Sequence, residues 1–174
     1  MPQPGMCWRH AVISTHNSWL PGDPRGFRSK EHQIHSSGDY KNPPPPGEHA
    51  RLHQWNQDRG GVAVVIPEDL REVAGRAILA QLKSLEYQIL ALAVAGTHAH
   101  GLIELPDDVP QIKRVLGKCK RKSSHAIRER LPGRVWGFGG SWKRVETPNY
   151  QRAVFEYILR QENAWVWSFR DKAS

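Results

Sequence analysis

The 174-residue chain is poor in several features, and each scarcity excludes a class of protein. It has two cysteines, Cys7 and Cys119, which lie far apart and form no CxxC pair. A disulfide framework and a four-cysteine zinc site are therefore excluded, and we expect two reduced thiols in a cytoplasmic protein. No run of about 18 apolar residues occurs, so we expect no transmembrane helix and no membrane partner. The opening MPQPGMCWRH lacks a basic region followed by an apolar core, so we expect no secretory signal.

Positive charge, in contrast, is concentrated in one stretch of the chain. The whole chain has 25 Lys and Arg against 17 Asp and Glu, a formal net charge of +8. Residues 107–146 contain 11 basic and 4 acidic residues, so this stretch alone has a net charge of +7. A concentrated excess indicates a docking surface for a polyanion, whereas a solvated helix face is the alternative interpretation.

Hydrophobic periodicity predicts alternating strands and helices over most of the chain. Apolar residues recur at helical spacing in three segments, and Pro67 suits the first position of the first of these helices. β-Branched or continuous apolar runs predict strands, and GVAVVI at 61–66 fits either a short strand or the entry to a helix. The expected strands are 7–18, 88–96, 97–105 and 134–146, and the expected helices are 67–85, 108–130 and 148–163.

Residues 19–60 interrupt this pattern. They are rich in glycine and contain a continuous proline run from Pro43 to Pro46, so we expect a loop-rich insertion with little regular structure. Without the insertion the order is βαββαβ plus a C-terminal helix. This order predicts a single α+β domain over residues 1–174, with a ferredoxin-like antiparallel sheet and its helices on one face.

Four side chains could carry chemistry. His98 and His100 are two residues apart on an expected strand, so they share one face and could form half of a metal site. On the expected C-terminal helix, Tyr157 and Gln161 share a face, which offers a phenol nucleophile and an amide oxygen as third ligand. A hydrogen-bonded histidine pair and a packed aromatic remain the structural alternatives. Tyr150 is the competing nucleophile on the same stripe.

The same segments resemble a known family. GTHAHGLIEL resembles the His-hydrophobic-His motif of single-strand nucleases and transposases, and EYILRQE resembles the catalytic helix of their single-tyrosine members. STHNSWLPGDPRGF is similar to the N-termini of insertion-sequence and REP-associated tyrosine transposases, the HUH class. The resemblance covers most of residues 7–165. The chain departs from the family in the small Ala99, in RQEN at 160–163 where repeat-associated relatives have Asn-Pro-Val, and in its longer insertion.

The resemblance implies a DNA transposase that acts on single-stranded or hairpin DNA. His98, His100 and Gln161 would hold Mg²⁺ or Mn²⁺, and Tyr157 would form a 5′-phosphotyrosine link that another 3′-hydroxyl resolves. It also implies a cytoplasmic, nucleoid-associated protein. Members of the family act as homodimers with exchanged helices or as monomers, and both arrangements stay open.

The basic stretch then has an expected role in DNA binding. Trp136, Phe138 and Trp142 lie among basic residues, so they could stack on bases or belong to the core. The residues expected to contact phosphates are Lys113, Arg114, Lys118, Lys120, Arg121, Lys122, Arg128, Arg130, Arg134, Lys143 and Arg144.

Three other functions are compatible with parts of this pattern. The first is a non-catalytic, domesticated nucleic-acid-binding protein on the same fold. The second is a metal-dependent hydrolase of a small phosphoester, for which DNA binding should be weak and insensitive to salt. The third is a ferredoxin-like RNA-binding protein, but the apolar run 89–95 is poorly suited to an exposed sheet face.

Overall fold

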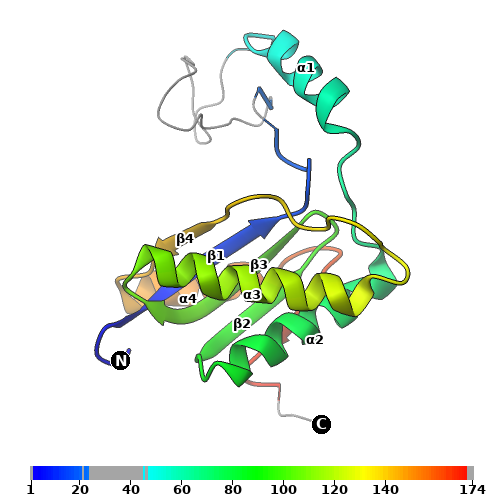
Figure 1. Ribbon diagram of the computed structural model, residues 1–174. Coiled ribbons are helices and arrows are strands. Elements are labelled where there is room, and N and C mark those ends of the chain that lie inside the picture. The colour runs from blue at the N-terminus through cyan, green and yellow to red at the C-terminus, as the bar shows by residue number, and fades with distance from the viewer. Residues whose placement is uncertain (1, 21, 24–44, 46, 172–174) are drawn as a thin grey trace.

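The fold is an α+β arrangement with a five-stranded antiparallel sheet and four helices, as seen in a computed structural model (Figure 1). The structure describes residues 2–20, 22–23, 45 and 47–171. Most of the predicted insertion, including three of the four prolines of its run, lies outside the described residues. The strands are β1 (Met6–Ser14), β2 (Ile89–Val94), β3 (His98–Pro106), β4 (Ser141–Arg144) and β5 (Trp165–Ser168). The helices are α1 (Ala50–Gly60), α2 (Glu68–Ser84), α3 (Val109–Ile127) and α4 (Pro148–Leu159).

The sheet has the strand order β4-β1-β3-β2-β5, and every pairing is antiparallel. Side chains of a strand alternate between its two faces, so β3 presents Ala99 and Ile103 on one face and Leu102 on the other. Ala99 and Ile103 belong to a core formed with α2 and α3, whereas Leu102 packs with Val154 and Ile158 of α4. The sheet is therefore covered on both faces (Figure 1).

The three predicted helices, α2, α3 and α4, begin at or within one residue of their predicted positions. Asp108 caps α3 by accepting a hydrogen bond from the Gln111 backbone N–H, and Thr147 caps α4 by accepting one from Tyr150. Pro67 occupies the cap of α2 rather than its first turn. None of the helices in the described ranges is both long enough and apolar enough to cross a membrane.

The predicted helix over 148–163 is too long, and α4 lies on the other face of the sheet from α2 and α3. It ends at Leu159, so Gln161 lies just beyond the helix instead of on its face. The turn is nevertheless tight, because the Gln161 backbone N–H donates to the Ile158 carbonyl. Gln161 thus stays close to Tyr157, although for a reason other than helical periodicity.

The predicted strand over 134–146 is wrong for most of its length. Only β4 at its end is a strand, and Trp136 forms an isolated bridge with Thr15. The reason lies in the glycines: Gly139 has φ +78° and Gly140 has φ +154°, where a Cβ would lie 2.9 Å from the Val12 carbonyl oxygen. Such backbone angles interrupt a strand.

Three other expectations also need correction. The segment 19–60 contains the helix α1, which has no buried residue and stands away from the sheet (Figure 1). Residues 61–66 are neither strand nor helix, because backbone hydrogen bonds instead tie Val64 to His16 and Ile66 to Gly96. The chain beyond α4, where the sequence predicts no strand, forms an additional edge strand, β5.

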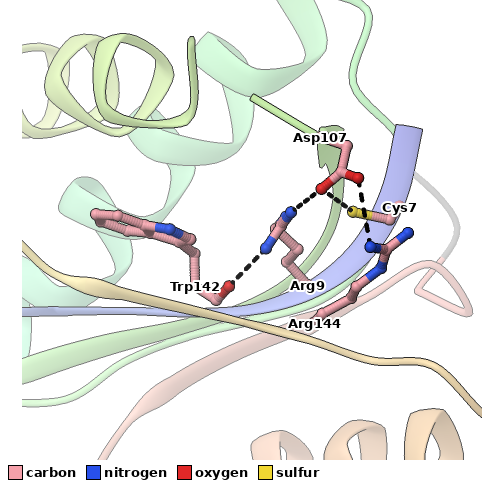
Figure 2. A network of polar contacts seen from close by, with 5 residues as sticks. All are labelled: Cys7, Arg9, Asp107, Trp142 and Arg144. Atoms are coloured by element: carbon pink, nitrogen blue, oxygen red, sulfur yellow. Dashed lines mark hydrogen bonds and ion pairs between the residues drawn. The ribbon is translucent and has the colours of Figure 1, made fainter. Parts of the chain in front are cut away.

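A buried arginine joins β1, β4 and the start of α3. Arg9 donates to the Asp107 carboxylate at 2.5 Å and to the Trp142 carbonyl at 3.1 Å (Figure 2). The guanidinium of Arg144 in β4 lies 3.3 Å from Oδ2 of Asp107. The Cys7 thiol lies 3.8 Å from Oδ1, the oxygen that also accepts from Arg9. These contacts fix the short edge strand β4 against the body of the sheet.

Two helical glycines give opposite predictions for stability. A Cβ at Gly75 of α2 would lie 2.1 Å from Cε3 of Trp165, whereas a Cβ at Gly117 of α3 would meet nothing within 4 Å. We expect Gly75→Ala to lower the free energy of unfolding by about 1–3 kcal/mol, because Trp165 and β5 must move. Gly117→Ala should raise it by about 0.5–1 kcal/mol. Urea denaturation measures both, and a stabilised Gly75→Ala protein would contradict the packing described for β5.

Candidate active site

The two histidines of the predicted motif point to the face of the sheet that α4 covers. His98 and His100 alternate with the core residues Ala99 and Gly101, which places both imidazoles on the side of Leu102. Their rings lie edge to face with centroids 4.8 Å apart. His100 is only 6% exposed, whereas His98 is half-buried. The prediction that the pair shares one face is therefore confirmed.

Gln161 and Tyr157 meet this pair from α4 and the turn beyond it. The Oε1 atom of Gln161 lies 3.3 Å from Nε2 of His98. The Tyr157 ring stands edge to face with the His100 ring, with centroids 5.4 Å apart, and the tyrosine is 51% exposed. All four predicted residues are thus brought together, with the tyrosine reachable from solvent.

Tyr150, the competing nucleophile, lies in a different environment. It is half-buried, packs against the cluster beneath α4, and its ring lies under the Lys143 ammonium at 5.2 Å. The described ring contacts of His10 and His100 to a tyrosine are to Tyr157. The geometry therefore favours Tyr157.

A fifth residue of the site, His10, was missed by the sequence analysis. It lies on β1, where its neighbour Val12 pairs with His100 and His10 itself pairs with Leu102, so its side chain shares their face. Its Nε2 is 3.0 Å from Nδ1 of His100, and the two rings are stacked at 5.2 Å. The signal was a lone histidine in a β-rich segment, which becomes informative only once the register of β1 against β3 is known.

Each histidine of the pair has a hydrogen-bonding neighbour at Nδ1. Nδ1 of His98 is 3.1 Å from the Thr97 hydroxyl, and Nδ1 of His100 is 3.0 Å from His10 Nε2. A neighbour at Nδ1 orients an imidazole for binding a metal through Nε2, and Nε2 of His98 faces Gln161 Oε1.

Burial favours the neutral forms of His100 and His10. The pKa of His100 is lowered to about 3 by burial first and then by His98 and His10. The pKa of His10 is lowered by burial and by the charge of Lys143. A neutral imidazole has a free lone pair, which a metal ligand requires.

The spacing of the candidate ligands is compatible with an octahedral divalent ion. Two ligands at right angles around Mg²⁺, with bonds of about 2.1 Å, lie about 3 Å apart, close to the spacing of His98 Nε2 and Gln161 Oε1. Within the described ranges, no three His, Cys, Asp or Glu side chains are grouped so as to hold a metal. The candidate set is instead two imidazoles and one amide oxygen.

The site opens into a hollow of about 1370 Å³, which we call the tyrosine cleft. It extends from the histidines toward the glycine-rich segment before β4. Its lining includes His10, Val12, His100, Arg134, Phe138, Trp142, Lys143 and Tyr157.

The predicted phosphate-binding residues fall into two groups. In the part of the chain that the structure describes, five of them make no ion pair or side-chain hydrogen bond, and these are Lys113, Arg114, Lys118, Arg121 and Lys122. The other six have partners within the protein. Arg130 pairs with Asp69, Arg144 with Asp107, Arg134 with the Trp136 carbonyl, Arg128 with His125, Lys143 with the Tyr150 ring, and Lys120 with the Gly137 and Gly139 carbonyls.

The three aromatic residues before and within β4 have different environments. Trp136 is 4% exposed and donates from Nε1 to the Ser123 hydroxyl, so it belongs to the core. Trp142 is half-buried and packs against the same core. Phe138 is 95% exposed and is therefore free to stack on a ligand.

The histidine cluster makes stability depend on pH in a defined direction. Because the pKa of His100 is about 3 in the folded protein and about 6.5 when unfolded, the unfolded chain binds more protons as the pH falls below 6.5. We expect the metal-free protein to lose roughly 1 kcal/mol of stability between pH 8 and pH 5.5 from this residue, with His10 adding in the same direction. Urea denaturation with a chelator present measures this loss. It should shrink in His100→Gln and persist in His125→Gln, an exposed residue of α3; equal losses in the wild type and His100→Gln would contradict it.

Comparison with known proteins gives no match for this chain among protein-family models, curated proteins or solved structures.

Proposed function

We propose that the chain is a metal-dependent DNA transposase of the single-tyrosine HUH type, which cleaves and rejoins single-stranded DNA through a 5′-phosphotyrosine link. The observation that carries the proposal is the meeting of four side chains from β3, α4 and the following turn. His98 Nε2 lies 3.3 Å from Gln161 Oε1, and Tyr157 stands over His100. Imidazole and amide ligands beside an accessible phenol are the combination that this chemistry needs.

The arrangement of the sheet supports the same proposal. The first four strands have the order β4-β1-β3-β2, which is the order expected for a ferredoxin-like βαββαβ unit. In this arrangement β3 lies at the centre of the sheet, and α4 covers the face that carries the histidines. The covered sheet face counts against an RNA-binding protein that would stack bases there.

The residues that would hold Mg²⁺ or Mn²⁺ are His98, His100 and Gln161. The bound ion would polarise the scissile phosphate and neutralise the charge that develops on it. His10 would orient His100 by accepting a hydrogen bond from its Nδ1, 3.0 Å away.

Tyr157 would act as the nucleophile. Its phenolic oxygen forms a bond to phosphorus while the bond from phosphorus to the 3′-oxygen breaks. The phenolic proton is released, and the departing 3′-oxygen takes up a proton. One phosphoester is exchanged for another, so attack by a second 3′-hydroxyl rejoins DNA without water or an external energy source. The five cations of α3 without partners would bind phosphates of a hairpin or flanking strand.

The decisive experiment is a search for the covalent intermediate. Labelled single-stranded DNA with a flanking hairpin, incubated with the wild-type protein and Mn²⁺, should yield a protein–DNA adduct on a denaturing gel. Binding without any adduct would instead favour the non-catalytic DNA-binding protein. Binding that is weak and insensitive to salt would favour the hydrolase of a small phosphoester.

A further inference from the structure

A second hollow, of about 740 Å³, adjoins the tyrosine cleft and is not explained by cleavage chemistry. It lies between α3 and the segment that leads into β4, and we call it the aromatic pocket. Five residues line both hollows, so the two share a wall formed by this segment: Arg134, Gly137, Phe138, Gly139 and Trp142. The volume is within the range of about 300–1,000 Å³ that small organic ligands occupy.

The base of the aromatic pocket is apolar and fixed in place. Leu116, Val135 and Trp136 are buried in the core, and the Trp136 ring is held by its hydrogen bond to Ser123. Phe138 lines the same pocket with 95% of its surface exposed. A flat aromatic ring open to solvent, beside a rigid apolar surface, suits a planar partner.

The lining residues carry positive charge only. Lys113, Arg121 and Arg134 belong to the lining, and no acidic residue of the described ranges does. The fourth cation, Lys120, donates to the carbonyls of Gly137 and Gly139 and so holds the glycine-rich segment in position. Its pKa is lowered by burial and by Arg134, in keeping with the concentrated positive charge. The complementary ligand is therefore planar, apolar on its faces and anionic at its edge.

Because Gly117 has no side chain, part of the space in the aromatic pocket is open at this position. It lies on α3, lines the pocket, and a Cβ placed there would meet no atom within 4 Å. A larger side chain at this position would therefore occupy the pocket without displacing the core.

We propose that the aromatic pocket binds one unpaired nucleotide of single-stranded DNA, adjacent to the phosphate in the tyrosine cleft. The base would lie against Phe138 and the apolar surface, and the backbone phosphates would contact Lys113, Arg121 and Arg134. The identity of the strand as DNA rests on the proposed function. Because Phe138 and Arg134 line both hollows, a strand that follows this shared wall would run from the pocket toward Tyr157.

The test compares two labelled oligomers with the same number of phosphates, an eight-nucleotide oligothymidylate and an eight-unit abasic chain. Binding to the full-length protein is followed by fluorescence anisotropy. The wild type should bind the oligothymidylate about tenfold more tightly, since stacking of a base on an aromatic side chain has an effect of this size. Equal affinities for the two oligomers would overturn the proposal.

Two variants test whether the preference for bases comes from the aromatic pocket. Gly117→Leu fills the pocket, and Phe138→Ala removes a fully exposed ring that stabilises nothing in the fold. Both should reduce the preference for bases to about twofold or less while leaving affinity for the abasic chain unchanged. Ala126→Leu, at an exposed position of the same helix outside the pocket, is the matched control and should keep the preference. A tenfold preference that survives both substitutions would place base recognition elsewhere.

The experiments distinguish failure of the nucleotide-site proposal from failure of the transposase proposal. A protein that forms the covalent adduct but binds both oligomers equally has the proposed activity and lacks this nucleotide site. A protein that prefers bases, loses the preference in Gly117→Leu and forms no adduct has the nucleotide site without the activity.

Discussion

The substitution Tyr157→Phe should abolish the covalent protein–DNA adduct and lower strand cleavage by roughly 10³-fold or more. It removes only the phenolic oxygen, and the ring keeps its edge-to-face contacts with His10 and His100. Because Tyr157 is half exposed and lies in the last turn of α4, the fold and DNA affinity should not change. Denaturing gels of labelled DNA with Mn²⁺ measure the adduct, and anisotropy measures binding.

Tyr150→Phe is the matched control, since it makes the same change on the same helix. The Tyr150 ring is half-buried beneath Lys143, so loss of the Tyr150 hydroxyl should leave adduct formation close to the wild-type level. An adduct that survives Tyr157→Phe and disappears in Tyr150→Phe would identify Tyr150 as the nucleophile.

Loss of either histidine of the pair should have the second-largest effect. We expect His98→Ala and His100→Ala each to lower cleavage by about 100-fold or more, because each removes a ligand that would hold the ion against the phosphate. Mn²⁺ affinity should fall in parallel, as measured by electron paramagnetic resonance titration. Affinity for single-stranded DNA in the presence of a chelator should stay the same, because the unpaired cations of α3 are untouched.

His125→Ala is the matched control for the His98→Ala and His100→Ala variants. His125 is exposed on α3, away from the two lined hollows, so cleavage and Mn²⁺ affinity should match those of the wild type. Undiminished cleavage by the wild-type protein in excess chelator would contradict the metal dependence altogether.

Local sequence patterns predicted the central part of the fold because strand alternation and helix capping arise from interactions between neighbouring residues. The alternation along His98, Ala99 and His100 places the two imidazoles on one face in any strand. Thr147 and Pro148 start α4 because a side-chain cap and a proline without an N–H both suit a helix N-terminus. These features depend on neighbouring residues alone.

Other parts of the site depend on contacts between distant segments. His10 joins the site only through the register that sets β1 against β3, which no short window of sequence reveals. The end of α4 at Leu159 could not be predicted, since neither proline nor glycine follows it. The Phe138 surface arises from glycines with positive φ, whose effect is to turn an apparent strand into a loop.

The charge pattern in the sequence indicated where the basic surface lies, but it did not indicate which of its side chains have partners within the protein. Sequence cannot distinguish Lys113, which has no ion pair or side-chain hydrogen bond among the described residues, from Lys120, whose ammonium holds the segment before β4. Both are lysines of one helix, separated by two turns. The difference appears only when the neighbouring carbonyl groups are in place.

The carboxylate of Asp107 has a thermodynamic consequence beyond its ion pairs. It binds Arg9 and Arg144 together, and Arg9 in turn holds the backbone of Trp142, which lines both the tyrosine cleft and the aromatic pocket (Figure 2). Interaction energies within one such network are not additive. Asp107, which lines neither hollow, thus helps through Arg9 to hold in place a residue that lines both.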